Sequence, residues 1–183
     1  MKRIINFIAL SIAIAAFSFL NTNAQGSSDL RSAQTIEHKV FKEIITLPYY
    51  GVFDHIAFKV DRGTVTLYGK VISLGTRKAA ENEVRRIPGV TNVVNNIENL
   101  PLGSFDNSIR RQMLKTFSDR GGSLYRYLLE PNPSIRIIVD GGHVSLEGFV
   151  ANRGDSDLAN ILAKGVRNVF SVTNNLVVGK APR

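Results

Sequence analysis

The sequence contains no cysteine, and only three of its 183 residues are histidines. Without cysteine, the chain forms no disulfide and cannot carry the acylated thiol that anchors bacterial lipoproteins. The histidines, His38, His55 and His143, do not stand at the spacing of metal ligands, and we expect all three in ordinary solvated positions. The sequence therefore predicts no metal site and no cofactor.

Motifs for catalysis are also missing. The chain has no Gly-x-Ser-x-Gly nucleophile elbow and no phosphate-binding loop. Asp61 and Asp140 stand in two similar short turns, but a turn aspartate that bonds its own backbone accounts for both. No second carboxylate recurs beside them to form a pair for general acid–base catalysis. We predict that the protein has no catalytic residues and is not an enzyme.

The first 24 residues have the pattern of a secretory signal peptide. Lys2 and Arg3 form a basic start, residues 7–20 are apolar, and small residues precede a cleavage position near Ala24. An uncleaved membrane anchor is the alternative, because the apolar run nearly reaches the length that crosses a bilayer. We expect export to the periplasm, with a flexible segment over residues 25–33 of the mature chain.

Acidic residues are fewer than basic residues, 15 against 23. Without Lys2 and Arg3, 21 basic and 15 acidic residues remain, a net charge of +6. Because we expect export, we predict no nucleic acid partner; anionic lipid headgroups or envelope polysaccharide are the polyanions within reach. A positive surface that only keeps the protein in solution is the alternative.

One unit of the sequence is present twice. A shift of 79 residues places residues 56–97 on residues 135–176 without a gap, and 14 of the 42 aligned positions are identical. An internal repeat of this length indicates two copies of one folding unit. We place the first module at residues 34–101, the second at residues 102–179, and a C-terminal tail at residues 180–183.

Each module is predicted to fold in the order α-β-β-α-β. Apolar residues alternate in the strands and recur every three or four residues in the helices. The fold class is α+β, with each module a three-stranded mixed sheet packed on two helices. The apolar helix positions are Ile36, Val40, Ile44, Ala80, Val84 and Ile87 in the first module and Ile109, Met113, Phe117, Ala159, Ala163 and Val166 in the second.

Glycine recurs where an ordinary side chain does not fit. One pair stands in the hairpin turns, where a positive φ is required, and another stands inside strands, where a bulge or a close helix needs space. A third position, glycine in one module and asparagine in the other, is predicted as a left-handed helix C-cap. The residues that we assign to turns and caps are Asp61, Gly63, Gly69, Gly89, Asp140, Gly142, Gly148 and Asn168.

Two further pairs have predicted structural roles. Ser73 and Asn152 align as N-caps of the second helix in each module. Asn95 and Asn174 align in the third strand, where we expect their amides to satisfy local backbone groups rather than to bind a ligand.

These motifs resemble the BON domain family. Residues 61–71 read Asp-x-Gly-x-Val-x-Leu-x-Gly-x-Val, and residues 89–97 read Gly-Val-x-x-Val-x-Asn-Asn-Ile. The second module repeats the first motif over residues 140–150, but Asn168 replaces the glycine of the second. The resemblance implies a role in envelope integrity, osmotic stress and binding to phospholipid membranes, without catalytic residues.

The second module carries the predicted binding surface. Together with the C-terminal tail, over residues 102–183, it holds 11 basic and 7 acidic residues, against 9 and 7 in residues 34–101. Its first loop is six residues longer, and residues 124–129 combine aromatic, leucine and arginine side chains that suit the interface of an anionic bilayer. Packing over the end of the sheet is the alternative. The candidate membrane-binding residues are Arg110, Arg111, Lys115, Tyr125 and Arg126.

Reversible association with anionic phospholipid is thus the expected function. A protein-interaction or chaperone-like role with envelope proteins is the alternative, through a free sheet edge or the aromatic loops. Binding of cell-wall polysaccharide through exposed tyrosines is a third hypothesis.

Overall fold

The computed structural model describes residues 22–129 and 132–179. The predicted signal peptide up to residue 21 and the predicted tail at residues 180–183 lie outside these ranges. The first module contains α1 (Thr22–Ile45), β1 (His55–Asp61), β2 (Thr64–Val71), α2 (Leu74–Arg85) and β3 (Asn92–Asn99). The second contains α3 (Ser104–Asp119), the 3-10 helix η1 (Gly122–Tyr127), β4 (Ile135–Asp140), β5 (His143–Val150), α4 (Arg153–Lys164), β6 (Ser171–Asn174) and β7 (Val177–Val178).

The predicted order α-β-β-α-β is confirmed in both modules. In each sheet the second strand is central: β2 pairs antiparallel with β1 and parallel with β3, and β5 pairs in the same way with β4 and β6. The third strand of the second module is interrupted, because β6 ends at Asn174 and the short β7 continues the pairing with β5. Both sheets are therefore mixed, as expected.

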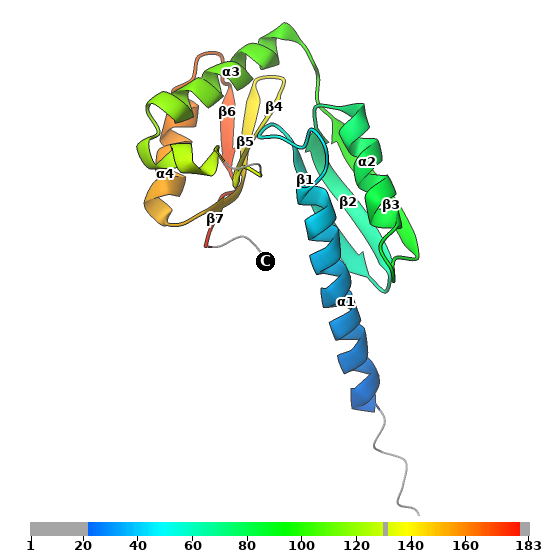
Figure 1. The fold of residues 1–183 in the computed structure, drawn as a ribbon. Coiled ribbons are helices and arrows are strands. Elements are labelled where there is room, and N and C mark those ends of the chain that lie inside the picture. The colour runs from blue at the N-terminus through cyan, green and yellow to red at the C-terminus, as the bar shows by residue number, and fades with distance from the viewer. Residues whose placement is uncertain (1–21, 130–131, 180–183) are drawn as a thin grey trace, which may run out of the picture.

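The helices bury the apolar faces that their periodicity predicts. All twelve predicted helix positions are buried, together with alternate residues of the sheets, and they form a separate core in each module. Each fully buried aliphatic side chain contributes about 1.5–3 kcal/mol relative to an exposed one. Both helices of a module therefore pack on one face of its sheet, and Figure 1 shows the two modules side by side.

Helix α1 is longer than predicted. It begins at Thr22 and runs without interruption to Ile45, so residues 25–33, predicted as a flexible segment, are helical. In Figure 1 the N-terminal part of this helix extends past the first sheet. Among the described residues, no helix is both long and apolar enough to cross a membrane.

The hairpin turns have the geometry that the repeated glycines predict. Arg62 and Gly63 have φ values of 45° and 81°, and Gly141 and Gly142 have values of 58° and 81°. Positive φ at both central residues matches the twist of the flanking strands, and glycine adopts it without strain.

The two turn aspartates contact other groups than predicted. The Asp61 carboxylate pairs with the Arg62 guanidinium at 3.4 Å, and the Asp140 carboxylate pairs with the Lys70 ammonium of the first module at 2.5 Å. The two central N–H groups of the second turn donate to the buried carboxylate of Asp106 in α3, each at 2.9 Å. Helix α3, rather than the turn itself, therefore holds the second hairpin.

Positions 69 and 148 require glycine because the backbone of a neighbouring strand, rather than a helix, lies too close for a side chain. They have φ values of 121° and 108°. A Cβ atom would lie 2.2 Å from His55 O in the first module and 2.0 Å from Ser134 O in the second. The prediction that a glycine is needed holds, but the crowding group is the backbone at the start of the adjoining edge strand.

Gly89 and Asn168 have the predicted positive φ, 98° and 69°, but they are not helix caps. Helices α2 and α4 are capped three residues earlier, by Arg86 and Gly165. The positive φ instead belongs to the turn that leads into the third strand. In the first module, Val90 N–H closes this turn by donating to Ile87 O at 3.0 Å. The N-caps Ser73 and Asn152 are as predicted, since each side chain accepts from an N–H of the first helical turn.

Asn95 and Asn174 tie the third strand to the second helix. The Asn95 amide donates to Arg77 O of α2 at 3.2 Å, and its oxygen accepts from Ile97 N–H at 3.1 Å. Asn174 makes the equivalent bonds with α4 and with the chain after β6. The predicted local role of both asparagines is confirmed.

Candidate functional site

Arg110 belongs to the interior of the second module rather than to its surface. Its side chain is only 2% exposed. The guanidinium donates to Val139 O at 2.6 Å, to Asn107 Oδ1 at 2.8 Å and to Pro101 O at 3.2 Å. Burial lowers the pKa of Arg110, and the charge of Asp106 opposes that change. The prediction that Arg110 contributes to a membrane-binding surface is therefore wrong.

The other four candidate residues lie on the surface of α3 and η1, which pack against each other. Arg111 is exposed and forms no ion pair among the described residues. The Lys115 ammonium pairs with the carboxylate of Asp119 at 2.5 Å. Tyr125 is 45% exposed, and the Arg126 side chain, also exposed, pairs with a carboxylate of α4. These four residues remain candidates by position, with part of their charge neutralised.

The long loop of the second module packs inward and faces solvent at the same time. Leu124 and Tyr127 are buried in the core, whereas Tyr125 and Leu129 are exposed, Leu129 by 60%. The 3-10 geometry of η1 places Leu124 and Tyr127 on one side of this short helix and Tyr125 on another, and Leu129 follows the helix. Both expectations for this loop, core packing and an exposed aromatic surface, thus apply to different residues.

A buried carboxylate fixes η1 to the second helix of the module. Asp155 accepts hydrogen bonds from the Ser123 hydroxyl, from the Tyr127 hydroxyl at 2.5 Å and from the Arg126 guanidinium at 2.7 Å. Burial by itself raises the pKa of Asp155, but these hydrogen bonds and the charge of Arg126 lower it overall. Asp155 therefore stays ionised and holds the loop in place.

The two modules are joined by the loop between α1 and β1. Ile137 N–H of β4 donates to Val52 O at 2.7 Å, and the Arg136 guanidinium donates to Gly51 O at 2.6 Å. The same guanidinium lies over the Tyr50 ring, 4.2 Å from its centre. Because β4 is an edge strand, this loop covers backbone groups that would otherwise be open to pairing with another chain.

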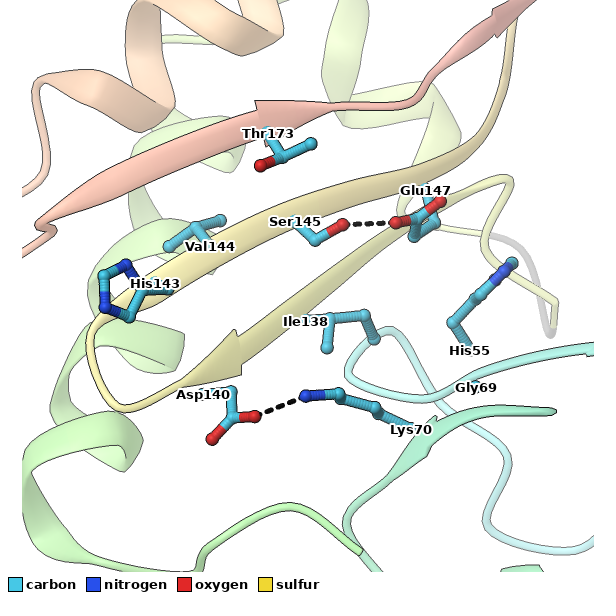
Figure 2. A pocket seen from close by; sticks show the side chains of 10 residues that line it. All are labelled: His55, Gly69, Lys70, Ile138, Asp140, His143, Val144, Ser145, Glu147 and Thr173. Atoms are coloured by element: carbon cyan, nitrogen blue, oxygen red, sulfur yellow. Dashed lines mark hydrogen bonds and ion pairs between the residues drawn. The ribbon is translucent and has the colours of Figure 1, made fainter. Parts of the chain in front are cut away.

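A cleft of about 380 Å³ lies between the modules, over the helix-free face of the second sheet. Figure 2 shows its lining side chains, which come from β1 and β2 of the first module and from the strands of the second. The lining residues are His55, Gly69, Lys70, Ile138, Asp140, His143, Val144, Ser145, Glu147 and Thr173. Neither module alone supplies all of these groups.

The Lys70–Asp140 ion pair crosses one side of the cleft (Figure 2). The hydrogen bond that Lys70 donates to Asp140 is the main reason that the pKa of Lys70 is raised, and Glu98, 3.5 Å away, adds to the effect. Both groups are partly exposed, and pairs of this kind are worth about 0–1 kcal/mol. The pair therefore orients the two modules more than it stabilises them.

His55 is not in the solvated position that its sequence context predicts. It is half-buried at the start of β1 and faces the second module across the cleft. Burial lowers the pKa of His55; the negative charge of Glu147 opposes this change and the positive charge of Arg136 adds to it. The imidazole is therefore mainly neutral at neutral pH.

Sequence reasoning missed the cleft because its groups belong to separate modules. The outward register of Lys70, Asp140 and Glu147 follows from strand alternation, but alternation does not show which outward faces meet. Among the described residues there is no group of three side chains that could hold a metal ion. The cleft thus combines acidic, hydroxyl and imidazole groups with apolar side chains such as Ile138 and Val144.

Comparisons with known proteins place the chain in a family. The chain matches two solved structures of CdsD, a structural protein of the type III secretion system of Chlamydia trachomatis. One, its C-terminal domain, is 11% identical with a TM-score of 0.30 over 78% of this chain and 96% of that one. The other is 14% identical with a TM-score of 0.29 over 80% and 93%. No curated protein matches the sequence. The BON domain model matches residues 32–101 and 122–180, and the chain therefore belongs to the BON domain family.

Proposed function

We propose that this BON-domain chain is a non-catalytic binding protein of the periplasm that associates reversibly with anionic phospholipid surfaces through α3 and η1. The observation that carries the proposal is a set of exposed residues on or directly after these two elements: Arg111 and Arg120 at α3, and Tyr125 and Leu129 at η1. Tyrosine and leucine suit the boundary between headgroups and acyl chains, and arginine attracts anionic headgroups.

The charge of this surface supports the proposal. Lys115 and Arg126 are paired with carboxylates, whereas Arg111 and Arg120 form no ion pair among the described residues. A basic side chain near an anionic membrane contributes about 1 kcal/mol, which is roughly a fivefold change in affinity. A few such contacts produce weak association that salt screens.

Co-sedimentation with vesicles tests the proposal. We expect binding to vesicles that contain phosphatidylglycerol, weakening as salt rises, and little binding to neutral phosphatidylcholine vesicles. The double variant Arg111→Glu and Arg120→Glu should lose binding at least tenfold. The control is Arg62→Glu, at an exposed arginine in the first hairpin. Equal binding to neutral vesicles, or equal loss with the control, would overturn the proposal.

A second candidate function, contact with envelope proteins, is favoured by the edge of the first sheet. Strand β3 is eight residues long and pairs only with β2 among the described strands, and Val94 on it is 39% exposed. A long open edge is a template for pairing with a strand of another protein. Val94→Lys should abolish any partner capture that survives high salt, and capture that this change leaves intact would exclude the edge.

A further inference from the structure

The carboxylate of Glu147 faces the cleft without an ion pair among the described residues. Arg136 is its cross-strand neighbour, but the guanidinium turns to the Tyr50 ring and to the loop of the first module. One Glu147 oxygen, Oε1, accepts from the Ser145 hydroxyl and from the Asn175 amide, the latter at 2.7 Å. These donors are neutral, so a half-buried negative charge lacks a countercharge.

His55 and Ser145 lie on the same part of the cleft as Glu147 (Figure 2). The neutral imidazole of His55 has a lone pair on one ring nitrogen. The hydroxyl of Ser145 donates a hydrogen bond to Glu147, and its oxygen, which accepts from the Asn175 amide at 3.4 Å, keeps a second lone pair. Three hydrogen-bond acceptors, one of them negatively charged, are therefore available to a ligand.

We propose that the cleft between the modules binds a primary ammonium group, with Glu147 as its countercharge and His55 and Ser145 as further acceptors. An ammonium has three N–H donors and no acceptor, which matches this set of groups. A volume of about 380 Å³ lies within the usual range of small-molecule sites, roughly 300–1,000 Å³. The ligand is a small amine or a lipid whose headgroup ends in a primary ammonium.

The lining also sets the specificity. It contains no phenylalanine, tyrosine or tryptophan, so the cleft lacks the aromatic faces that recognise quaternary ammonium ions. A trimethylated nitrogen has no N–H group to donate to the three acceptors. The cleft therefore prefers ethanolamine to choline, which carries the same hydroxyethyl arm.

The site needs both modules in place. His55 comes from β1, whereas Ser145 and Glu147 come from β5, and the loop contacts to β4 hold the two strands together across the cleft. This ligand site is distinct from the surface of α3 and η1, so its failure and that of membrane association are separable.

Titration of the full chain with ethanolamine, followed by NMR, tests the site. A ligand with so few atoms binds weakly, so millimolar concentrations are needed. We expect saturable shifts for residues of β1 and β5, no such response to choline, and at least a tenfold loss of affinity in Glu147→Gln. Glu98→Gln, the same change at an exposed carboxylate beside Lys70, is the control and should bind as wild type.

The source of the ammonium is distinguished with vesicles. At equal anionic content, a lipid source predicts tighter binding to phosphatidylethanolamine than to phosphatidylcholine vesicles, and Glu147→Gln removes the difference. Equal vesicle binding together with a saturable response to ethanolamine identifies free amines as the source. A wild-type chain that responds to neither, or Glu147→Gln that binds ethanolamine unchanged, would overturn the proposal.

Discussion

Two adjacent arginines of α3 have opposite environments. The Arg110 guanidinium donates to Val139 O at 2.6 Å and to two other oxygens, while Arg111 is exposed. Helical geometry explains the difference, because neighbouring residues point about 100° apart around the axis. Arg110 shares the inward side of α3 with Ile109 and Met113.

We predict that Arg110→Ala destabilises the second module by about 2–4 kcal/mol, because buried acceptors lose their donor and a cavity remains. Arg111→Ala, the adjacent control, should change stability by less than about 0.5 kcal/mol. Urea unfolding followed by circular dichroism measures both. Similar losses in the two variants would contradict the buried role of Arg110.

Two glycines of the second hairpin distinguish the cost of steric crowding from the cost of a positive φ. Gly148 has a positive φ, and a Cβ atom there would lie 2.0 Å from a carbonyl oxygen, whereas Gly141 has a positive φ and open space. We predict that Gly148→Ala costs more than about 3 kcal/mol, while Gly141→Ala costs about 1–2 kcal/mol from φ alone. Thermal unfolding compares them, and equal costs would show that steric crowding is unimportant.

At the scale of elements, the connection between the third strand and the second helix recurs in both modules. Asn95 joins β3 to α2, and Asn174 joins β6 to α4. Because parallel pairing to the central strand leaves the third strand at an edge, an amide bond to the helix holds it from a second direction. This explains why an asparagine stands at the inward position of an otherwise apolar strand pattern.

We predict that Asn95→Ala lowers the stability of the first module by about 1–3 kcal/mol, since Arg77 O and Ile97 N–H lose the hydrogen bonds that the Asn95 side chain makes to them. Asn96→Ala is the control, because Asn96 is exposed and adjacent. Hydrogen exchange of β3 amides should accelerate in the first variant only. Unchanged exchange in Asn95→Ala would rule out its role in holding the strand.

At the scale of the whole molecule, the two modules form one unit through polar contacts and apolar packing. The loop between α1 and β1 supplies Val52 O to the edge of β4, and Val52 and Phe53 also pack against the second core. The cleft with His55, Lys70 and Glu147 follows from this arrangement. The second sheet is thereby protected at its β4 edge, while β3 of the first sheet stays open.

The lowered pKa of His55 predicts a stability that depends on pH. Burial against the second module disfavours the protonated form, so the folded pKa lies below the ordinary value of about 6.5. As pH falls from about 6.5 toward the folded pKa, the unfolded chain takes up a proton that the folded chain does not. The contribution of His55 to the free energy of unfolding is therefore complete above about pH 6.5, and it decreases as the pH falls toward the folded pKa.

Urea midpoints at pH 7.5 and 5.5 measure this dependence. His55→Gln should reduce the loss of stability at the lower pH, because the titrating group is gone. His143→Gln, at an exposed position of the same cleft, should retain the wild-type loss. A His55→Gln variant with the full wild-type loss would show that groups other than His55 cause it.

The sequence by itself determined the features that depend on local geometry. Alternation and helical periodicity predicted the α-β-β-α-β order and the buried helix positions, and the repeat predicted two modules. Positive φ at Gly63 and Gly142 followed from turn chemistry, and the N-caps followed from side-chain type. Each of these features depends on residues a few positions apart, whose relation the chain itself sets.

Only the tertiary structure decided which polar groups are buried and which meet. The burial of Arg110, the use of Asp106 to hold the second hairpin and the pairing of Lys70 with Asp140 join segments about 30 to 70 residues apart. Sequence patterns indicate on which face of a helix or strand a side chain lies, but they do not show which distant residue it contacts. The cleft and its unpaired Glu147 exist because two modules dock, and docking depends on contacts that no local pattern contains.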